Sequence, residues 1–174
     1  MTFYSYVFVK APATFPSELR RRMTATKLHY VNPTTGSRDH FSVLETDTRA
    51  EASGYVAREF KDAGATSSQL AFANRIPPTP NMLKYMAQRN SEAFLQVSVQ
   101  PGQADTVFNR ASDPMGPIKD THIGSATVDM AAAAPSPYQV IIGLGASLQS
   151  TVDSDIAKVR GWSEVSGVDV IRRA

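Results

Sequence analysis

The feature that most constrains the fold is the spacing of apolar residues along the first seventy positions, which changes several times between strand-like and helix-like patterns. Residues 2–9 are dense in aromatic and β-branched side chains, which predicts a well-covered strand. Pro16 and the polar residues after it have helix-start chemistry, so we expect a short helix over 17–23. The apolar stripe of this short helix consists of Leu19 and Met23 alone.

A hairpin and a stronger helix are predicted next. Two β-rich runs, 27–31 and 40–44, flank a cluster of turn-forming residues over 32–37. Thr48 and Glu51 then have the spacing of a capping box, and Gly64 has the character of a helix stop. The predicted inward face of this helix is Ala52, Tyr55, Val56, Phe60 and Ala63. A strand over 69–73 follows.

Taken together, residues 2–73 give the order strand, helix, strand, strand, helix, strand. This is the order of a ferredoxin-like βαββαβ unit, so we predict an α+β chain with such a domain at 1–76. A proline-rich joint at 76–80 separates it from a second α/β half at 77–174. The second half is expected to pack against the first, either as its own domain or in one continuous domain.

The second half is predicted in less detail. A helix from Pro80 to Phe94 should bury apolar side chains, and 95–99 alternates like a strand. No period is sustained over 100–137, apart from a candidate strand near 122–130, so we expect a long irregular insertion there. A strand at 138–142, a helix at 150–159 and a strand at 168–171 complete the chain. The side chains assigned to the first helix are Met82, Leu83, Met86 and Phe94.

Composition excludes several functions. With 42% hydrophobic and 20% charged residues the chain should fold into a globular structure, and without cysteine it has no disulfide, thiolate nucleophile or cysteine metal site. The net charge of +2 makes nucleic acid an unlikely partner. The most apolar stretch, 130–148, is interrupted by prolines and glycines, so no membrane span is predicted. We expect a cytoplasmic or equivalent reducing, soluble compartment without a secretory signal.

Three motifs are of types that can carry chemistry. Gly143 and Gly145 follow an apolar strand, but Leu148 stands where a dinucleotide fingerprint needs glycine, so we predict a tight strand-to-helix turn. His29 and His40 could share a divalent metal with Asp39 if one sheet face held both imidazoles. No third nitrogen ligand is near, and no serine has elbow spacing. We therefore predict no catalytic residue, no cofactor and no metal.

The candidate binding residues are aromatic, basic or proline side chains that suit a protein partner. Aromatic residues fall on both faces of the first strand, three arginines stand together, and two prolines lie in the irregular segment. The predicted partner-binding residues are Tyr4, Tyr6, Phe8, Arg20, Arg21, Arg22, Pro114 and Pro117.

These features favour a non-enzymatic structural or protein-interaction subunit of a larger assembly, with protein partners or self-assembly. The layout of residues 2–73 resembles the small linker domains of phycobilisomes, which implies such a role. The alternative is a small-molecule enzyme or binder of the dimeric α/β-barrel type, with His29, His40 and Tyr30 as its polar groups. A third hypothesis is a weak nucleic-acid-binding module that uses Arg20, Arg21 and Arg22.

Overall fold

The computed structural model describes residues 2–73, 91–129 and 137–174 of a mixed α+β fold. The chain divides into two compact units, Met1–Ala73 (unit 1) and Asn74–Arg173 (unit 2). Each unit has its own antiparallel sheet and its own helices. Within the described ranges, no helix has the length and apolar character needed to cross a membrane.

Unit 1 has four strands, two α-helical segments and one π-helical turn. The strand order in its sheet is β4-β1-β3-β2, and every neighbouring pair is antiparallel. The elements are β1 (Phe3–Lys10), α1 (Phe15–Arg22), β2 (Leu28–Thr35), β3 (His40–Thr46), α2 (Arg49–Tyr55), η1 (Val56–Phe60) and β4 (Ser67–Phe72).

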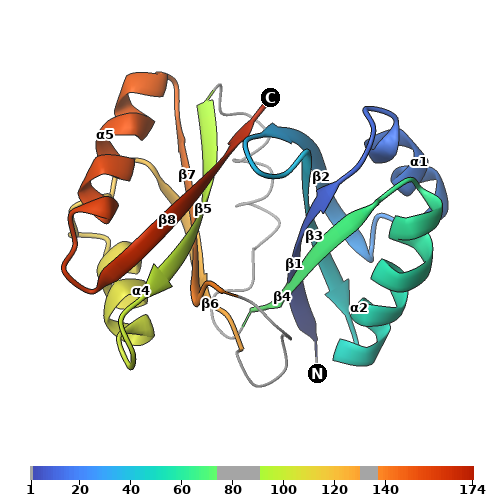
Figure 1. Cartoon of the computed structure of the whole chain (residues 1–174), viewed down its shortest axis with the longest axis horizontal. Helices are drawn as coiled ribbons and strands as arrows, with labels where there is room; N and C mark the ends of the chain where they lie inside the picture. Colours follow the sequence, from blue (N-terminus) through green and yellow to red (C-terminus); the bar gives the residue numbers. More distant parts are fainter. Residues whose placement is uncertain (1, 74–90, 130–136) are drawn as a thin grey trace. The chain divides into compact units, whose positions relative to one another are not determined.

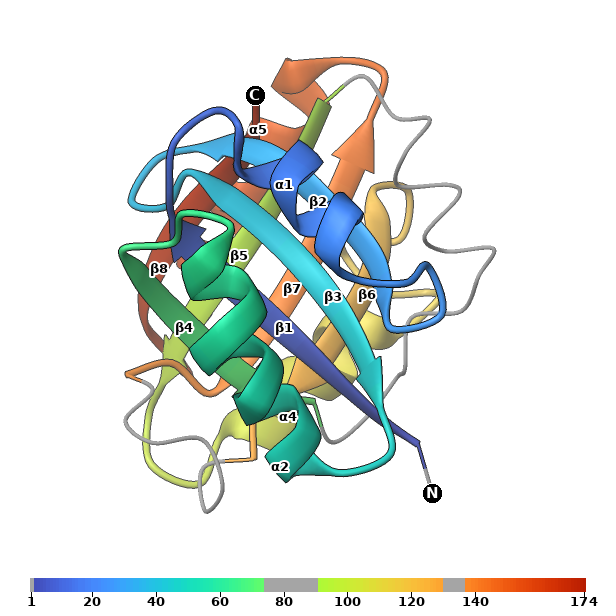
Figure 2. The ribbon, with the colours of Figure 1, turned by 90° about the vertical axis from the view of Figure 1, so that its right-hand side faces the viewer.

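Both helices of unit 1 lie against the same face of its sheet (Figures 1 and 2). The ring of Phe15 on α1 lies 5.1 Å from that of His40 and 5.6 Å from that of Phe60. The guanidinium of Arg49 on α2 lies 5.5 Å from the ring of Phe3. Since alternate residues of a strand point to opposite faces, the even-numbered residues of β1 point away from these helices.

Unit 2 repeats this architecture. Its strand order is β8-β5-β7-β6, so its first and third strands are central, as they are in unit 1. A buried aliphatic core lies between this sheet and the two helices found among the described residues of the unit, with members such as Leu95, Val107, Ile142 and Ile156. The elements are β5 (Ser91–Val99), α4 (Ala104–Ser112), β6 (His122–Thr127), β7 (Val140–Ala146), α5 (Gln149–Arg160) and β8 (Val165–Arg173).

The two units also share one irregularity. In unit 1, Leu28 is opposite Leu44 but Tyr30 is opposite Val43, so β2 has one extra residue, His29. In unit 2, His122 is opposite Leu144 and Gly124 is opposite Gly143, so Ile123 is the extra residue of β6. Each unit therefore has a β-bulge between its second and third strands.

The strongest predictions from the sequence are confirmed. Thr48 accepts a hydrogen bond from the Glu51 amide at 3.0 Å, and α2 begins directly after it. Gly64, with φ 114°, closes the helical segment in a conformation that side-chain-bearing residues rarely adopt. Of the predicted inward face, Ala52, Phe60 and Ala63 are buried, whereas Tyr55 and Val56 are only half-buried.

Three predictions for the second half are wrong. The segment 100–137 is not a long irregular insertion, because it contains α4, which was not predicted, while β6 confirms the candidate strand near 122–130. Phe94 belongs to β5 rather than to a helix, and the rest of that predicted helix, with Met82, Leu83 and Met86, lies outside the described residues. Gly143 and Gly145 lie inside β7 rather than in a turn. A side chain at Gly143 would meet Ile123 Cγ1 at 3.1 Å, so the glycine makes room for the bulged residue.

Candidate functional site

The bulge in β2 decides which side chains meet in unit 1. In a regular strand His29 and Tyr30 would point to opposite faces. The extra residue breaks this alternation, since Tyr30 is opposite Val43 while His29 contacts Glu45, and residues 43 and 45 of β3 share a face. We call this face, opposite α1 and α2, the tyrosine face. Its aromatic members are Tyr4, Tyr6, Phe8, Tyr30 and Phe41.

A histidine-carboxylate pair lies at one end of the tyrosine face. His29 Nε2 is hydrogen-bonded to Glu45 Oε2, and the two side chains are 22% and 31% exposed. Tyr4 is opposite Glu45 in the sheet, and its ring stacks on the imidazole with 6.3 Å between centroids. The pair is therefore held in place by its neighbours and partly exposed to solvent.

The geometry determines how this pair can exchange a proton. Because an ionised carboxylate only accepts hydrogen bonds, the neutral imidazole that pairs with Glu45 is the tautomer with the proton on Nε2 and the lone pair on Nδ1. Partial burial raises the pKa of the Tyr4 phenol, and the nearby Glu45 carboxylate raises it further. Tyr4 thus stays protonated at neutral pH and can donate a hydrogen bond beside a base.

The centre of the tyrosine face is aromatic and buried. The ring of Phe41 lies 5.7 Å from that of Tyr6, 5.0 Å from that of Phe8 and 5.7 Å from that of Tyr30. Burial raises the pKa of the Tyr6 phenol, which is 7% exposed. Exposure on this face is therefore greater at the end where Tyr4, His29 and Glu45 lie.

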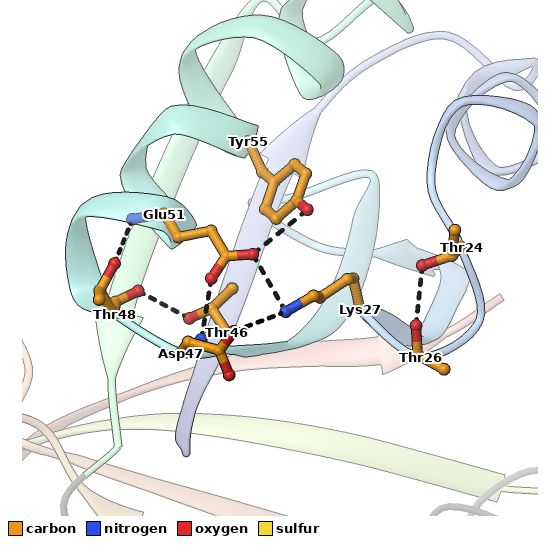
Figure 3. Close-up of polar contacts among 8 residues, drawn as sticks. All are labelled: Thr24, Thr26, Lys27, Thr46, Asp47, Thr48, Glu51 and Tyr55. Atoms are coloured by element: carbon orange, nitrogen blue, oxygen red, sulfur yellow. Dashed lines mark hydrogen bonds and ion pairs between the residues drawn. The ribbon is translucent and has the colours of Figure 1, made fainter. Parts of the chain in front are cut away.

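Figure 3 shows a polar cluster that borders this end of the sheet. Lys27 Nζ lies 3.1 Å from Glu51 Oε1 and 3.4 Å from Asp47 Oδ2. Glu51 Oε2 accepts a hydrogen bond from the Asp47 amide at 2.8 Å. That bond, followed by the contact with Lys27, lowers the pKa of Glu51, while Glu51 chiefly raises the pKa of Lys27.

His40 is not part of the candidate site. Its side chain packs on Phe15 of α1, and its Nε2 lies 3.0 Å from the Pro12 carbonyl oxygen. His29 and His40 thus lie on opposite faces of the sheet, contrary to the geometry that a shared metal requires. Among the described residues, no three histidine, aspartate or glutamate side chains form a group that could hold a metal ion.

The remaining candidate residues do not gather into one site. Tyr4, Tyr6 and Phe8 share the tyrosine face. The three arginines are exposed on α1, where Arg20 donates to the Val31 carbonyl oxygen at 2.6 Å and Arg21 pairs with Glu18. Pro114 and Pro117 are exposed in the connection from α4 to β6 of unit 2.

Glu45 was missed in the sequence. It continues the alternation of Phe41 and Val43, which could have assigned it to their face. Its partner could not be found in this way, because the bulge reverses the parity of β2 at His29.

Solved structures resemble the whole chain. A siroheme decarboxylase NirDL matches with a TM-score of 0.69 and 7% identity, covering 99% of this chain and 71% of its own. An anthrone oxidase-like protein matches with a TM-score of 0.59 and 12% identity, covering 99% and 91%. A mutant chlorite dismutase from Candidatus Nitrospira defluvii matches with a TM-score of 0.57 and 6% identity, also covering 99% and 91%. This likeness shows the fold alone.

The structural neighbours are folds of the dimeric α+β-barrel type. No protein-family model matches the sequence, and no curated protein matches it.

The likeness corrects our main functional prediction. We expected a non-enzymatic structural or assembly subunit, with a layout similar to phycobilisome linker domains. The structures that share the fold are instead named as oxidase-like, decarboxylase and dismutase proteins, which contradicts that prediction. The expectation also depended on a long irregular arm over 100–137, and that segment contains α4 and β6.

Proposed function

We propose that the chain is a small-molecule enzyme or binder of the dimeric α/β-barrel type, with unit 1 as its ferredoxin-like functional domain. The single observation that carries the proposal is the bulge that holds His29 between Glu45 and Tyr4 on the tyrosine face. The likeness to proteins named for reactions of anthrone, siroheme and chlorite supports a small molecule as the ligand.

The chemistry of the site favours a planar ligand with a weakly acidic O–H or C–H group. Tyr4, the half-buried tyrosine of this face, offers ring surface for stacking, which is worth about 1 kcal/mol for each favourable aromatic contact. His29 Nδ1 accepts the ligand proton, and the Glu45 carboxylate stabilises the imidazolium that forms. The Tyr4 hydroxyl donates a hydrogen bond to the ligand anion left behind.

Binding of 1-naphthol and anthrone, followed by NMR, tests the proposal. We expect the chemical-shift changes to centre on Tyr4, His29 and Glu45. His29→Gln removes the base, and Glu45→Gln removes the charge that supports it, so each should weaken binding roughly tenfold, as for loss of a charge-assisted contact.

A matched control is available in unit 2. His122 occupies the place that corresponds to Leu28, directly before the second bulge, and its side chain lies 3.3 Å from Ser125 rather than beside a carboxylate. His122→Gln should leave binding unchanged. The proposal fails if neither probe perturbs the tyrosine face, or if His29→Gln and His122→Gln bind the probes equally well.

A further inference from the structure

Glu51 links the two strand ends that carry the histidine-carboxylate pair. Its Oε1 accepts from Lys27 Nζ at 3.1 Å and from the Tyr55 hydroxyl at 3.3 Å, and its Oε2 accepts from the Asp47 amide at 2.8 Å (Figure 3). Lys27 is two residues before His29, and Asp47 is two residues after Glu45. One carboxylate on α2 therefore holds both chain segments.

We propose that Glu51 is a positioning residue for the His29-Glu45 pair, an inference that rests on the function proposed above. The bulge leaves His29 without an opposite residue on β3, so regular strand pairing does not fix its backbone. A side chain that fixes the two strand ends next to the pair supplies that restraint. Such restraint matters because a displacement of about 1 Å can cost roughly a hundredfold in activity.

Helix capping alone does not explain the geometry of Glu51. In a capping box the glutamate at this position bonds the amide of the N-cap residue, which here is Thr48. Glu51 instead bonds the amide of Asp47, one residue earlier, and reaches across to Lys27. These contacts extend beyond the helix into the strand ends.

The second unit shows that the fold does not require this link. The Glu45 amide donates to the Lys27 carbonyl oxygen at 2.9 Å, and the Gly145 amide donates to the Thr121 carbonyl oxygen at 2.8 Å. The same backbone contact thus forms in unit 2, where Thr151 stands at the third residue of α5. The contacts of Glu51 are thus found in the unit that has the histidine-carboxylate pair.

The Nε2–H proton of His29 provides a direct measure of the pair. In water a free imidazole N–H exchanges too fast to observe, whereas one held against a carboxylate gives a resolved downfield NMR resonance. We expect this resonance in the native protein and its loss in Glu45→Ala, which removes the acceptor. Glu51→Ala should broaden it beyond detection while circular dichroism shows that the protein remains folded, and Lys27→Met should weaken it.

Two controls separate positioning from stability. Phe60→Leu weakens the core of unit 1, because Phe60 is fully buried, and should retain the resonance. Thr151→Ala alters the corresponding place in α5 and should also retain it. A native-strength resonance in folded Glu51→Ala overturns the inference, as does its loss in Phe60→Leu at the same fraction folded.

The His29 resonance and the binding of the probes test the two proposals separately. If 1-naphthol and anthrone do not bind the native protein, the proposed function fails, yet the His29 resonance still decides whether Glu51 positions the pair. If they bind, Glu51→Ala should raise the dissociation constant roughly tenfold, and Thr151→Ala should not change it.

Discussion

The two units have the same backbone plan and different side chains at its most irregular point. Tyr4 and Glu45 are opposite each other in unit 1, and the corresponding pair in unit 2 is Glu92 and Gly145. The bulged residue is His29 in one unit and Ile123 in the other. Ile123 packs close over Gly143, whereas His29 bonds to Glu45. The bulge is therefore part of the shared fold. The chemistry available at it depends on which side chain occupies the bulged position.

Each unit also connects the segment before its bulge to its second helix by a different contact. In unit 1 the contact is the half-buried pair of Lys27 and Glu51. In unit 2 the buried Thr121 hydroxyl donates to Asp155, which also pairs with Lys158 at 2.8 Å. Full burial makes the second contact matter more for stability, and the greater solvent access of the first makes it more sensitive to pH and salt.

The largest predicted effect tests whether the two bulges are structurally equivalent. Leu44 and Leu144 are both fully buried, and each is opposite the residue that precedes its bulge. Leu44→Ala and Leu144→Ala should each lower the free energy of unfolding by about 3 kcal/mol, since both leave a cavity. Urea denaturation followed by circular dichroism measures both costs. A difference above about 2 kcal/mol would show that the two positions are not equivalent.

The next effect tests the buried contact of unit 2. Asp155→Ala leaves the buried Thr121 hydroxyl without its acceptor, so it should lower the free energy of unfolding by about 2 kcal/mol. Fluorescence of Trp162, the only tryptophan, can follow the denaturation. Asp153→Ala is the control, because Asp153 pairs with Arg172 at the surface and its loss should cost less than about 0.5 kcal/mol. Equal costs for the two variants would contradict the argument from burial.

A smaller effect compares the helix starts. Thr48 caps α2 with its side chain, whereas Leu148 at the start of α5 is 64% exposed and makes no side-chain cap. Thr48→Ala should cost about 1 kcal/mol. Leu148→Thr should add up to about 1 kcal/mol, because residue 148 already has the extended backbone of an N-cap. The midpoints of thermal unfolding should shift in opposite directions in the two variants. A lower midpoint for Leu148→Thr would contradict the expected gain from an N-cap at residue 148.

The sequence predicts those parts of unit 1 that depend on local chemistry. Thr48, Glu51 and Gly64 define α2 and its continuation because caps and stops act within a few residues. The helix α4 has no comparable signal. It is nine residues long, and Val107, Phe108 and Ala111 are its buried side chains, too few to establish a period against a background rich in alanine and glycine.

The candidate site was harder to predict because it depends on strand register. His29 and Glu45 are sixteen residues apart, and their contact requires both the β2-β3 pairing and the bulge within it. A one-residue change of register moves a side chain to the other face, so pattern alone could not distinguish His29 from His40. The sequence shows that these residue types are present, but it does not show that His29 and Glu45 are in contact.

The smallest effect concerns acid stability and uses the half-buried contact of Glu51 with Lys27 in unit 1. The Asp47 amide and then Lys27 lower the pKa of Glu51 below its ordinary 4.5. A carboxyl group with a lowered folded-state pKa stabilises the protein above its ordinary pKa, and this stabilisation is lost as the pH falls through the lowered value. Glu51→Gln removes that titration, so its stability should depend less steeply on pH below about pH 4.5 than that of the native protein.

The pH series separates this titration from other acid-sensitive groups. Glu18 and Glu164 also have lowered pKa values, through Arg21 and Arg110 respectively, so the native protein keeps part of its acid sensitivity in Glu51→Gln. Thr151→Ala alters the corresponding place in α5, has no titrating group to remove, and should reproduce the native slope. Urea midpoints measured between about pH 3 and pH 6 give the comparison. Parallel curves for the native protein and Glu51→Gln would mean that Glu51 keeps the same proton affinity in the folded and unfolded chains, and that its contacts with Lys27 and Asp47 do not persist in solution.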